Sequence, residues 1–335
     1  MFRGLQVVRA DDNTVTVSLR ADLQDADLGA GEITLDVEWS GINYKDGMAL
    51  AGNRGVMRTN PLIPGIDLVG TVSAIDETSA STFAVGDAVI VNGWGIGETQ
   101  HGGLSERAKV RSDWLVPLPA SLTPRRAAAI GTAGFTAALS VLALEHGSTG
   151  AAPIGDGEIL VTGATGGVGS IAIALLAASG YRVIASTGRD EHREYLLSLG
   201  AADTISRAEL EEPGRPLQKE RWAGVIDSVG GQTLATALSQ TVWGGTVTAC
   251  GMVGGTEIPT SVLPFILRGV NLAGINSVEC PLPLRLAAWQ RLADGLDTSL
   301  LDSMTTEISL AAAAEAGESI LRGELHGRTV VNVRS

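Results

Sequence analysis

The first third of the chain contains short apolar stretches in which β-branched and polar residues alternate. Between Gly4 and about Pro124 these stretches are bounded by glycine and aspartate. They are Thr14–Leu19, Ile33–Glu38, Asp67–Val72 and Asp87–Asn92. Period-two alternation between turn residues is typical of β-strands. The pattern therefore predicts an antiparallel, barrel-like β domain.

From about Arg125 the pattern changes to alternating helices and strands. Arg126–Glu145 is rich in alanine and leucine and predicts a long helix. The strands predicted after it are Ile159–Val161, Arg182–Ser186, Gly224–Asp227 and Thr246–Cys250, and the helices are Gly169–Ser179, His192–Leu199 and Thr233–Leu238. This alternation predicts a doubly wound parallel sheet, so the fold class is α/β. Glu209–Glu220 is predicted to be an exposed loop, and Ala311–Ile320 a helix.

Length and composition narrow the class of protein. A chain of 335 residues suggests about two domains, and 44% hydrophobic residues supply a large core. The net charge of −13 opposes binding to nucleic acid, although a few arginines in a cleft can still hold an anionic small molecule. Met1–Ala10 lacks an apolar signal core, and no apolar run reaches about 18 residues. We expect a cytoplasmic protein without a membrane partner.

The most informative segment is Ile159–Gly169, in which an apolar strand leads into a glycine turn and a helix. Ala164, Gly166 and Gly169 have the spacing of the dinucleotide fingerprint, with alanine in place of the first glycine. A glycine at the second position lets the backbone approach a pyrophosphate, and the third lets helix and strand pack closely. The surrounding strand–helix–strand rhythm favours this interpretation over an ordinary tight turn.

The residues after the next predicted strand bear on the choice of cofactor. In NAD-binding folds an acidic residue about 20 residues after the fingerprint holds the ribose 2′-hydroxyl. Here the strand is followed by Thr187, Gly188 and Arg189. A guanidinium can bind a 2′-phosphate with two hydrogen bonds, so the segment predicts NADP. The alternative is that Arg189 is an exposed residue at a helix start beside Asp190 and Glu191.

The sequence does not contain the ligand pattern of a zinc enzyme. Its two cysteines, Cys250 and Cys280, lie outside residues 1–125, where His101 is the only histidine. A catalytic zinc site needs three protein ligands around an open position. We therefore predict no metal, and reduction of a polarised alkene fits better than oxidation of an alcohol.

Further short segments resemble a known family. They are Asn43-Tyr44-Lys45-Asp46, Ile63-Pro64-Gly65-Ile66-Asp67, Gly93-Trp94-Gly95-Ile96-Gly97-Glu98, Gly102-Gly103-Leu104-Ser105-Glu106, Asp113-Trp114-Leu115-Val116, Gly131-Thr132-Ala133-Gly134-Phe135-Thr136-Ala137, Pro264-Phe265-Ile266-Leu267-Arg268 and Gly327-Arg328-Thr329. Over essentially its whole length the chain resembles the acrylyl-CoA reductase / zinc-independent quinone oxidoreductase family of the medium-chain dehydrogenase/reductase superfamily. Zinc-bearing relatives carry His-Glu where Ile66 and Asp67 stand, in agreement with a metal-free site.

The resemblance implies two domains and a set of cofactor contacts. Residues 1–125 and 276–335 would form a GroES-like catalytic domain, and residues 126–275 a Rossmann NADP-binding domain. The implied NADPH contacts are Tyr44, Thr165, Gly166, Gly167, Val168, Thr187, Gly188, Arg189, Arg207, Met252, Ile266 and Ser277. Arg207 would add a second cation near the 2′-phosphate, or else is a solvated loop residue beside Glu209. One family contact falls on Gly323, which offers only its backbone.

The resemblance also implies the reaction, which is reduction of acrylyl-CoA to propionyl-CoA. Hydride delivered to the β-carbon leaves an enolate that needs a hydrogen-bond donor. Tyr44 is the candidate catalytic residue for that donor, or its ring only stacks on the cofactor. The alternative functions are reduction of a quinone or alkenal and non-catalytic NADPH binding. The family further implies a homodimer joined through the strand near Val270–Ile275.

Several neighbouring residues have structural interpretations. Asn43 and Lys45 either assist Tyr44 at the reacting centre or are structural, with Asn43 capping a turn and Lys45 pairing with Asp46. Asp67 is expected to accept hydrogen bonds rather than act as a base. Trp94 and Trp114 are expected to be core or turn aromatics, and Cys250 to be buried. Three arginines are candidates for the phosphates of coenzyme A or for helix-end and surface pairing: Arg268, Arg322 and Arg328.

Overall fold

The computed structural model describes residues 1–77, 79–146 and 157–335, which divide into two compact units. The first unit comprises Met1–Thr132, Ser277–Leu286 and Leu301–Ser335, and the second comprises Ala133–Asn276 and Ala287–Leu300. This division differs from the predicted boundaries in three places. Residues 126–132 belong to the first unit, Asn276 belongs to the second, and residues 287–300 pack with the second although they come late in the chain.

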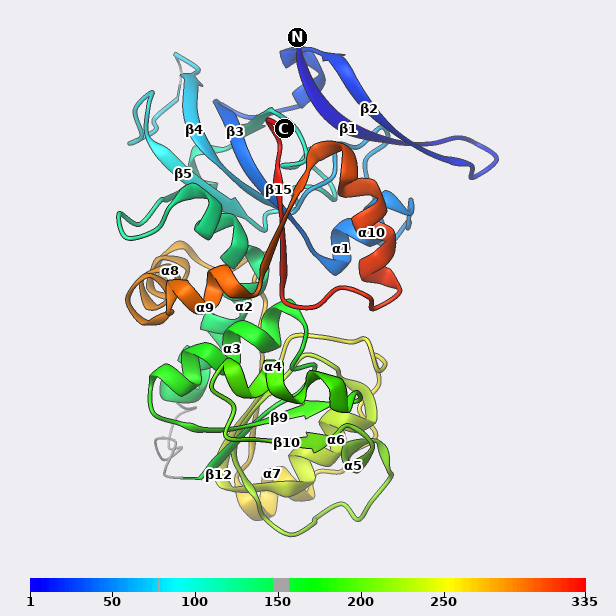
Figure 1. The fold of residues 1–335 in the computed structure, drawn as a ribbon, viewed down its shortest axis with the longest axis vertical. Coiled ribbons are helices and arrows are strands. Elements are labelled where there is room, and N and C mark those ends of the chain that lie inside the picture. The colour runs from blue at the N-terminus through cyan, green and yellow to red at the C-terminus, as the bar shows by residue number, and fades with distance from the viewer. Residues whose placement is uncertain (78, 147–156) are drawn as a thin grey trace. The chain divides into compact units, whose positions relative to one another are not determined.

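The first unit is built around a mostly antiparallel sheet (Figure 1). Its strand order is β14-β15-β3-β4-β5-β7, with β6 also paired to β3, and β1 and β2 form a separate hairpin. The strands are β1 (Phe2–Arg9), β2 (Val15–Leu23), β3 (Ile33–Ile42), β4 (Asp67–Ile75), β5 (Ala88–Asn92), β6 (Arg107–Val110), β7 (Val116–Pro117), β14 (Thr305–Ser309) and β15 (Arg328–Asn332). The C-terminal strand β15 lies between β14 and β3, so the tail of the chain completes the first unit.

The helices of the first unit pack against a core of buried aliphatic side chains. They are η1 (Asp25–Leu28), α1 (Tyr44–Leu50), η2 (Ser112–Trp114), η4 (Leu310–Ala312) and α10 (Ala313–Leu321). Helices α1 and α10 lie side by side, and Gly47 of α1 sits so close to Gly317 that a methyl group there would overlap its carbonyl oxygen. Leu35, Val37 and Leu68 on the central strands are at most 1% exposed. The core therefore holds α1 in a fixed position on the sheet.

The second unit is a parallel six-stranded sheet in the order β10-β9-β8-β11-β12-β13. Its strands are β8 (Glu158–Val161), β9 (Arg182–Thr187), β10 (Asp203–Ser206), β11 (Trp222–Asp227), β12 (Thr241–Ala249) and β13 (Asn271–Gly274), and the helices are α3 (Gly167–Ala178), η3 (Asp190–His192), α4 (Arg193–Ser198), α5 (Ala208–Glu211), α6 (Gly231–Gln240) and α7 (Leu263–Arg268). Figure 1 shows α3 and α4 on one face of this sheet and α6 and α7 on the other. Because the order reverses beside β8, this is the predicted doubly wound sheet.

Three helices run across the borders of the two units. They are α2 (Pro124–His146), α8 (Leu282–Gly295) and α9 (Thr298–Ser303). Helix α2 is long and apolar enough to cross a membrane, which the sequence did not indicate, but 83% of its most apolar window is buried inside the protein. It is therefore the buried core helix of a folded domain. Its helical geometry breaks at Gly131, where φ is 49° and ψ is −159°.

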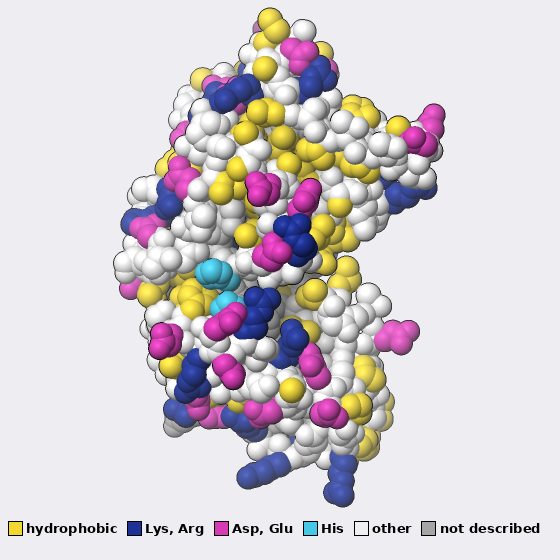
Figure 2. Space-filling model, turned by 45° about the vertical axis from the view of Figure 1, so that its right-hand side comes forward, with side chains coloured by type: hydrophobic (Ala, Val, Ile, Leu, Met, Phe, Trp, Pro, Cys, Tyr) yellow, Lys and Arg dark blue, Asp and Glu magenta, His cyan; other side chains and the backbone are white. Residues whose placement is uncertain are grey.

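Charged side chains on the surface are interspersed and locally paired. Figure 2 shows acidic and basic side chains mixed over the visible face. Pairs such as Arg20 with Asp22 and Arg322 with Glu324 join residues close together in the chain. Exposed pairs of this kind contribute little stability each.

The predicted loop Glu209–Glu220 is only partly correct. The chain forms one helical turn, α5, over Ala208–Glu211, and Leu210 is buried in the core of the second unit. A single apolar residue among charges was not recognised as an anchor. The rest of the segment, through Pro213 and Pro216, has no regular structure.

Candidate functional site

The glycine turn between β8 and α3 has the geometry of an anion site. Gly163 has φ of +57°, and Gly166 caps the twelve-residue helix α3. A methyl group on Gly169 would lie 2.5 Å from the carbonyl oxygen of Gly163 and 2.6 Å from Cα of Ala164. The helix can therefore start this close to the strand only with glycine there. The free N–H groups of its first turn, at Gly167 and Val168, suit a pyrophosphate.

Two arginines flank the end of the neighbouring strand β9. The backbone N–H of Arg207 donates to the carbonyl of Thr187 at 2.8 Å. A methyl group on Gly188 would lie 3.1 Å from Cζ of Arg207, so that guanidinium lies directly over the glycine. Arg189 follows, and its N–H donates to Oγ1 of Thr187 at 3.2 Å. Strands β8, β9 and β10 are adjacent, so these residues share the carboxyl edge of the sheet with the glycine turn.

The alternatives for the two arginines are also visible in the structure. Arg189 immediately precedes the short helix η3, and its Nη1 lies 3.5 Å from Nε2 of His192. Arg207 pairs with Glu211 at 2.8 Å rather than with Glu209. Both guanidinium groups remain exposed at the surface. Neither pairing prevents a phosphate from approaching Gly188 between them.

The remaining predicted cofactor residues lie in different places. Met252 follows β12 and is 64% exposed, and Ile266 on α7 is 68% exposed. Thr165 stands in the glycine turn of the second unit. Tyr44 and Ser277 belong to the first unit. The structure thus gathers the residues from Thr165 to Val168, Thr187 to Arg189 and Arg207 at one sheet edge, with Tyr44 and Ser277 on the other unit.

Tyr44 is the first residue of α1, and its side chain is 47% exposed. The residue before it, Asn43, caps the helix as predicted, and its N–H donates to Oδ2 of Asp46 at 2.8 Å. The Asn43 side chain donates to the same oxygen at 3.1 Å and to Asp67 at 2.7 Å. A capping box of this kind fixes the first turn of a helix. The Tyr44 phenol is therefore presented to solvent from a rigid base.

Asp67 is a structural hydrogen-bond acceptor, as predicted. It is fully buried, and its Oδ1 accepts from Asn92 Nδ2 at 2.7 Å, from the Thr132 N–H at 2.7 Å and from the Thr132 hydroxyl at 2.6 Å. Nη2 of Arg328 lies 3.7 Å from its other carboxylate oxygen. Arg328 also donates to the carbonyl of Ala129 at 2.5 Å. Such a web of donors satisfies a buried charge.

Burial sets the ionisation of the second carboxylate in this cluster. The pKa of Asp46 is raised to about 7, first by burial and then by the charge of Asp67, although N–H groups of Ile66 and Asn43 oppose the shift. Burial lowers the pKa of Arg328, while Asp67 and Asp46 raise it. The Arg328 guanidinium therefore interacts electrostatically with two buried carboxylates, that of Asp67 and that of Asp46 on α1.

One side chain near this cluster differs from its prediction. Lys45 pairs with Glu98 at 2.9 Å, not with Asp46, because Asp46 points into the protein. Glu98 belongs to the segment Gly93–Glu98, so this ion pair ties α1 to that loop. Within the same loop, Trp94 stacks on Trp114 with ring centroids 6.4 Å apart. Both rings pack against the core of the first unit, as expected of core aromatics.

The arginines considered for coenzyme A phosphates are engaged elsewhere. Arg328 is buried, so both the phosphate role and the surface pairing predicted for it are wrong. Arg268 donates to three backbone carbonyls and pairs with Glu220 at 3.1 Å. Arg322 pairs with Glu324 at 2.8 Å on the surface. For Arg268 and Arg322 the helix-end and surface pairings account for the observed contacts.

Comparisons with known proteins agree with this geometry. Residues 29–120 match the alcohol dehydrogenase GroES-like domain, and residues 167–294 match the zinc-binding dehydrogenase family. The chain is 47% identical to acrylyl-CoA reductase AcuI of Ruegeria pomeroyi over 100% of both chains. It belongs to the acrylyl-CoA reductase and quinone oxidoreductase family of medium-chain reductases. The predicted GroES-like and Rossmann-type fold is thereby confirmed.

Two further relatives in this family have been crystallised with nucleotides. The yhdH oxidoreductase from Salmonella enterica, solved in complex with NADP, is 47% identical, covers 99% of both chains and superposes with a TM-score of 0.93. The putative quinone oxidoreductase YhfP of Bacillus subtilis is 44% identical over 99% of both chains. Its structure has NAD bound and superposes with a TM-score of 0.92 at 99% coverage of both chains. The family thus contains members crystallised with either dinucleotide.

The name of the second matched family refers to zinc, but the side chains here do not suit that metal. Among the described residues, no group of three or more His, Cys, Asp and Glu side chains is placed to hold a metal ion. Nδ1 of His101 accepts a hydrogen bond from the N–H of Ile63 at 3.1 Å, and burial lowers its pKa. Cys250, which was predicted to be buried, is only half-buried, and the partial burial raises the pKa of its thiol to about 12. A thiol held neutral in this way is a poor ligand.

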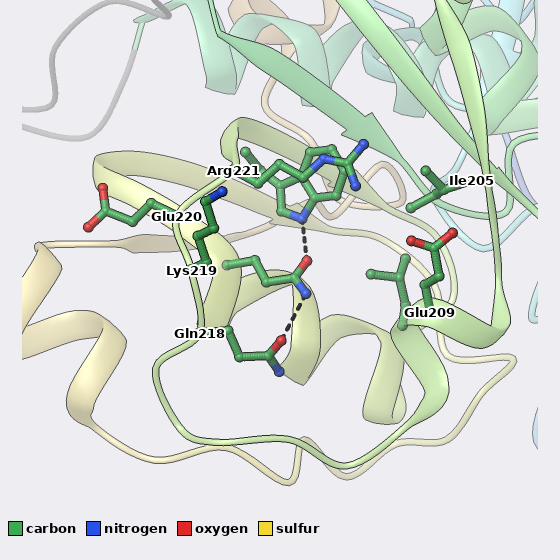
Figure 3. Close-up of a pocket in the computed structure, with 9 residues that line it drawn as sticks. Ile205, Glu209, Gln218, Lys219, Glu220 and Arg221 are labelled. Atoms are coloured by element: carbon green, nitrogen blue, oxygen red, sulfur yellow. Dashed lines mark hydrogen bonds between the residues drawn. The ribbon is translucent and has the colours of Figure 1, made fainter.

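A surface pocket of about 400 Å³ in the second unit lies apart from the predicted site (Figure 3). It is lined in part by Trp222, the first residue of β11, and by Gln218 and Gln240. The indole N–H donates to Gln240 at 2.8 Å, and Gln240 donates to Gln218 at 3.0 Å. None of the predicted cofactor residues lines it. The pocket therefore does not replace the glycine turn as the candidate site.

Proposed function

We propose that this chain is an NADPH-dependent reductase that converts an α,β-unsaturated acyl-CoA, acrylyl-CoA, to propionyl-CoA. The observation that carries the proposal is the full-length identity of 47% to a protein named acrylyl-CoA reductase. The site residues agree with it, since the glycine turn before α3 suits a pyrophosphate and two arginines beside Gly188 suit a 2′-phosphate. The enzyme would act as a cytoplasmic homodimer.

The reaction requires a hydride, a proton and a hydrogen-bond donor. When bound, NADPH supplies a hydride, which goes to the β-carbon of the alkene, and a proton added at the α-carbon completes the product. The intervening thioester enolate needs a hydrogen-bond donor at its oxygen. Tyr44 is our candidate for this donor, because the residue is half-exposed and its backbone is fixed by the Asn43–Asp46 capping box. In this proposal water supplies the proton at the α-carbon.

The runner-up function is reduction of a quinone or alkenal on the same scaffold. It is favoured by the identity of 44% to a putative quinone oxidoreductase and by the engagement of Arg268, Arg322 and Arg328 in protein contacts. The assay that decides is oxidation of NADPH, followed by its absorbance, with acrylyl-CoA or a simple quinone as acceptor. Faster turnover with acrylyl-CoA supports the proposal. Turnover with the quinone alone supports the runner-up, and binding of NADPH without turnover supports a non-catalytic role.

The same assay with NADH tests the role of Arg189. We expect Arg189→Gln to raise the KM for NADPH about tenfold or more, since a hydrogen bond to a charged group is lost, and to leave the KM for NADH unchanged. Arg182→Gln, at the amino end of the same strand and paired with Glu158, is the matched control. Equal effects of the two substitutions, or equal loss with both dinucleotides, would contradict recognition of a 2′-phosphate.

A further inference from the structure

A completely buried arginine lies next to Gly93–Glu98, the loop whose Glu98 pairs with Lys45. Arg285, on α8, has no exposed surface and is among the largest fully buried side chains of the protein. Its Nη1 donates to the carbonyl of Asn92 at 2.9 Å, and its Nη2 donates to the carbonyls of Ser277 at 3.2 Å and Val278 at 3.4 Å. These contacts all lie within the first unit.

The guanidinium also lies against an aromatic face. Its Cζ is 4.9 Å from the ring centroid of Trp94, which is within the range of a cation–π contact. Burial lowers the pKa of Arg285 to about 10, so the group stays charged at neutral pH. Burying a charge is costly unless hydrogen bonds compensate it, and here backbone carbonyls supply that compensation. Arginine suits this place because its fork can reach several acceptors at once.

The carbonyls belong to two segments that are far apart in the sequence. Ser277–Val278 follows β13, whereas Asn92–Trp94 starts at the last residue of β5. The N–H of Trp94 donates to the Val278 carbonyl at 3.0 Å, and a methyl group on Gly93 would lie 2.5 Å from that oxygen. Arg285 therefore clamps two backbones that already touch, and its loss would leave the Ser277 carbonyl without this donor.

Both clamped segments connect to residues of the proposed site. Ser277 is a predicted cofactor contact. Asn92 gives its carbonyl to Arg285 and its side-chain amide to Asp67, which in turn accepts from Asn43 beside Tyr44. A continuous series of hydrogen bonds thus runs from Arg285 to the base of α1. The Arg285 guanidinium therefore orients both the segment at Ser277 and the hydrogen-bonded residues that support Tyr44.

We infer that Arg285 is a positioning residue, which holds the Ser277–Val278 segment on the Asn92–Trp94 turn in the geometry that binds NADPH. This inference rests on the proposed function, because it uses Ser277 as a cofactor contact. Arg285 does not touch the cofactor in this account; it acts through the backbone of Ser277. A residue that only stabilised the fold would change the unfolding transition and leave the affinity for NADPH unchanged.

The test is titration of the protein with NADPH, followed by the fluorescence of the reduced nicotinamide. We expect Arg285→Met to raise the Kd for NADPH about tenfold, and Arg285→Lys to recover part of that loss by restoring a charged donor. Arg334→Met is the matched control, since Arg334 also donates to backbone carbonyls of the first unit, those of Val37 and Glu106. Its Kd should stay within about twofold of the wild type.

The outcomes separate this inference from the proposed function. A folded Arg285→Met protein that binds NADPH within about twofold of the wild type would overturn it, as would an equal effect of Arg334→Met. If Arg285→Met does not fold by circular dichroism, Arg285→Lys decides by the same criterion. The titration contains no acyl-CoA or quinone, so a wild type that binds NADPH but does not reduce acrylyl-CoA refutes the substrate and not the role of Arg285.

Discussion

At the scale of single residues, the most unusual feature is a buried cluster of two carboxylates and one guanidinium behind Tyr44. Asp46 and Asp67 are both fully buried, and Arg328 is 3% exposed. Three N–H hydrogen bonds to Asp46 favour its charged form, while burial and Asp67 oppose it more strongly. Such a group links the stability of the first unit to pH.

We predict that Asp46 makes the protein less stable as the pH rises through neutrality. Its pKa is about 7 in the folded protein and about 3.9 in an unfolded chain, so the folded state holds a proton that the unfolded state releases. This contribution is complete below about pH 4 and is lost as the pH rises through about 7. The measurement is urea unfolding of the wild type and of Asp46→Asn. The free energy of unfolding of the wild type minus that of the variant should fall by a few kcal/mol between about pH 5 and pH 8.

The control is Asp113, a carboxylate whose pKa is shifted in the opposite direction. Hydrogen bonds from Arg111 lower the pKa of Asp113, so Asp113 stays ionised over this pH range in both states. The difference between wild type and Asp113→Asn should therefore be constant. A constant difference for Asp46→Asn as well would show that Asp46 remains ionised in the folded protein.

The sequence indicated some of these residues and not others. Asn43 as a cap and Asp67 as an acceptor follow from local turn chemistry and from the position of Asp67 after Pro64-Gly65-Ile66. Arg328 was misassigned because its partners, Ala129 and Asp67, lie some two hundred residues or more away in the chain. The available sign that Arg328 is buried was its position immediately before the apolar residues Thr329–Val331. Arg285 gave no signal, since it stands in an ordinary helical pattern.

At the scale of elements, the break in α2 explains the segment Gly131–Ala137, which resembles one branch of the family. Gly131 leaves the helical region with φ of 49° and ψ of −159°, a conformation available essentially to glycine only. The turn directs the N–H and hydroxyl of the next residue, Thr132, toward Asp67. A methyl group on Gly131 would lie 2.9 Å from Nη2 of Arg328 and would overlap the Asp67 carboxylate.

We predict that Gly131→Ala destabilises the protein by about 3 kcal/mol or more, because backbone strain adds to a clash with a buried ion pair. Urea denaturation measures the change in the free energy of unfolding. Gly29→Ala is the matched control, since Gly29 has a similar backbone conformation, with φ of 80° and ψ of −155°, but a methyl group there would meet only Cδ2 of His101 at an ordinary 3.6 Å. It should cost less, about 1 to 3 kcal/mol from the strain alone. Equal losses for both would mean that the cluster tolerates the methyl group.

The elements that periodicity predicted are those with a strong local pattern. Helix α3 and strands β8, β9 and β11 appear within two residues of their predicted ends. Strand β12 begins at Thr241 instead of Thr246, because it pairs with β11 through a register shift that no periodicity reveals. Strands β14 and β15 were not predicted individually. Strand β14 pairs with β15, with Thr305 opposite Arg328, and β15 pairs with β3, with Thr329 opposite Ile42 near the other end of the chain, which only tertiary contacts determine.

At the scale of the whole molecule, the border between the units depends on contacts that composition does not show. Residues 287–300 return to the second unit, where Trp289 stacks on Phe135 with ring centroids 6.5 Å apart. Arg291 adds an ion pair with Glu145 at 2.9 Å. The resemblance placed this segment with the tail because the tail as a whole belongs to the first unit. Two aromatic rings and one ion pair explain the exception.

The edge of the parallel sheet bears on the oligomeric state of the protein. Strand β13 ends the sheet and pairs only with β12 among the described residues, so its outer edge can join that of a second copy. The N–H of Ile275 donates inward to Ala249, and by alternation the N–H of Gly274 points outward. We expect light scattering after size exclusion to give the mass of a dimer for the wild type and of a monomer for Gly274→Pro, since proline removes an outward donor. A monomeric wild type would refute joining of the sheets, whereas a dimeric Gly274→Pro protein would place the interface elsewhere.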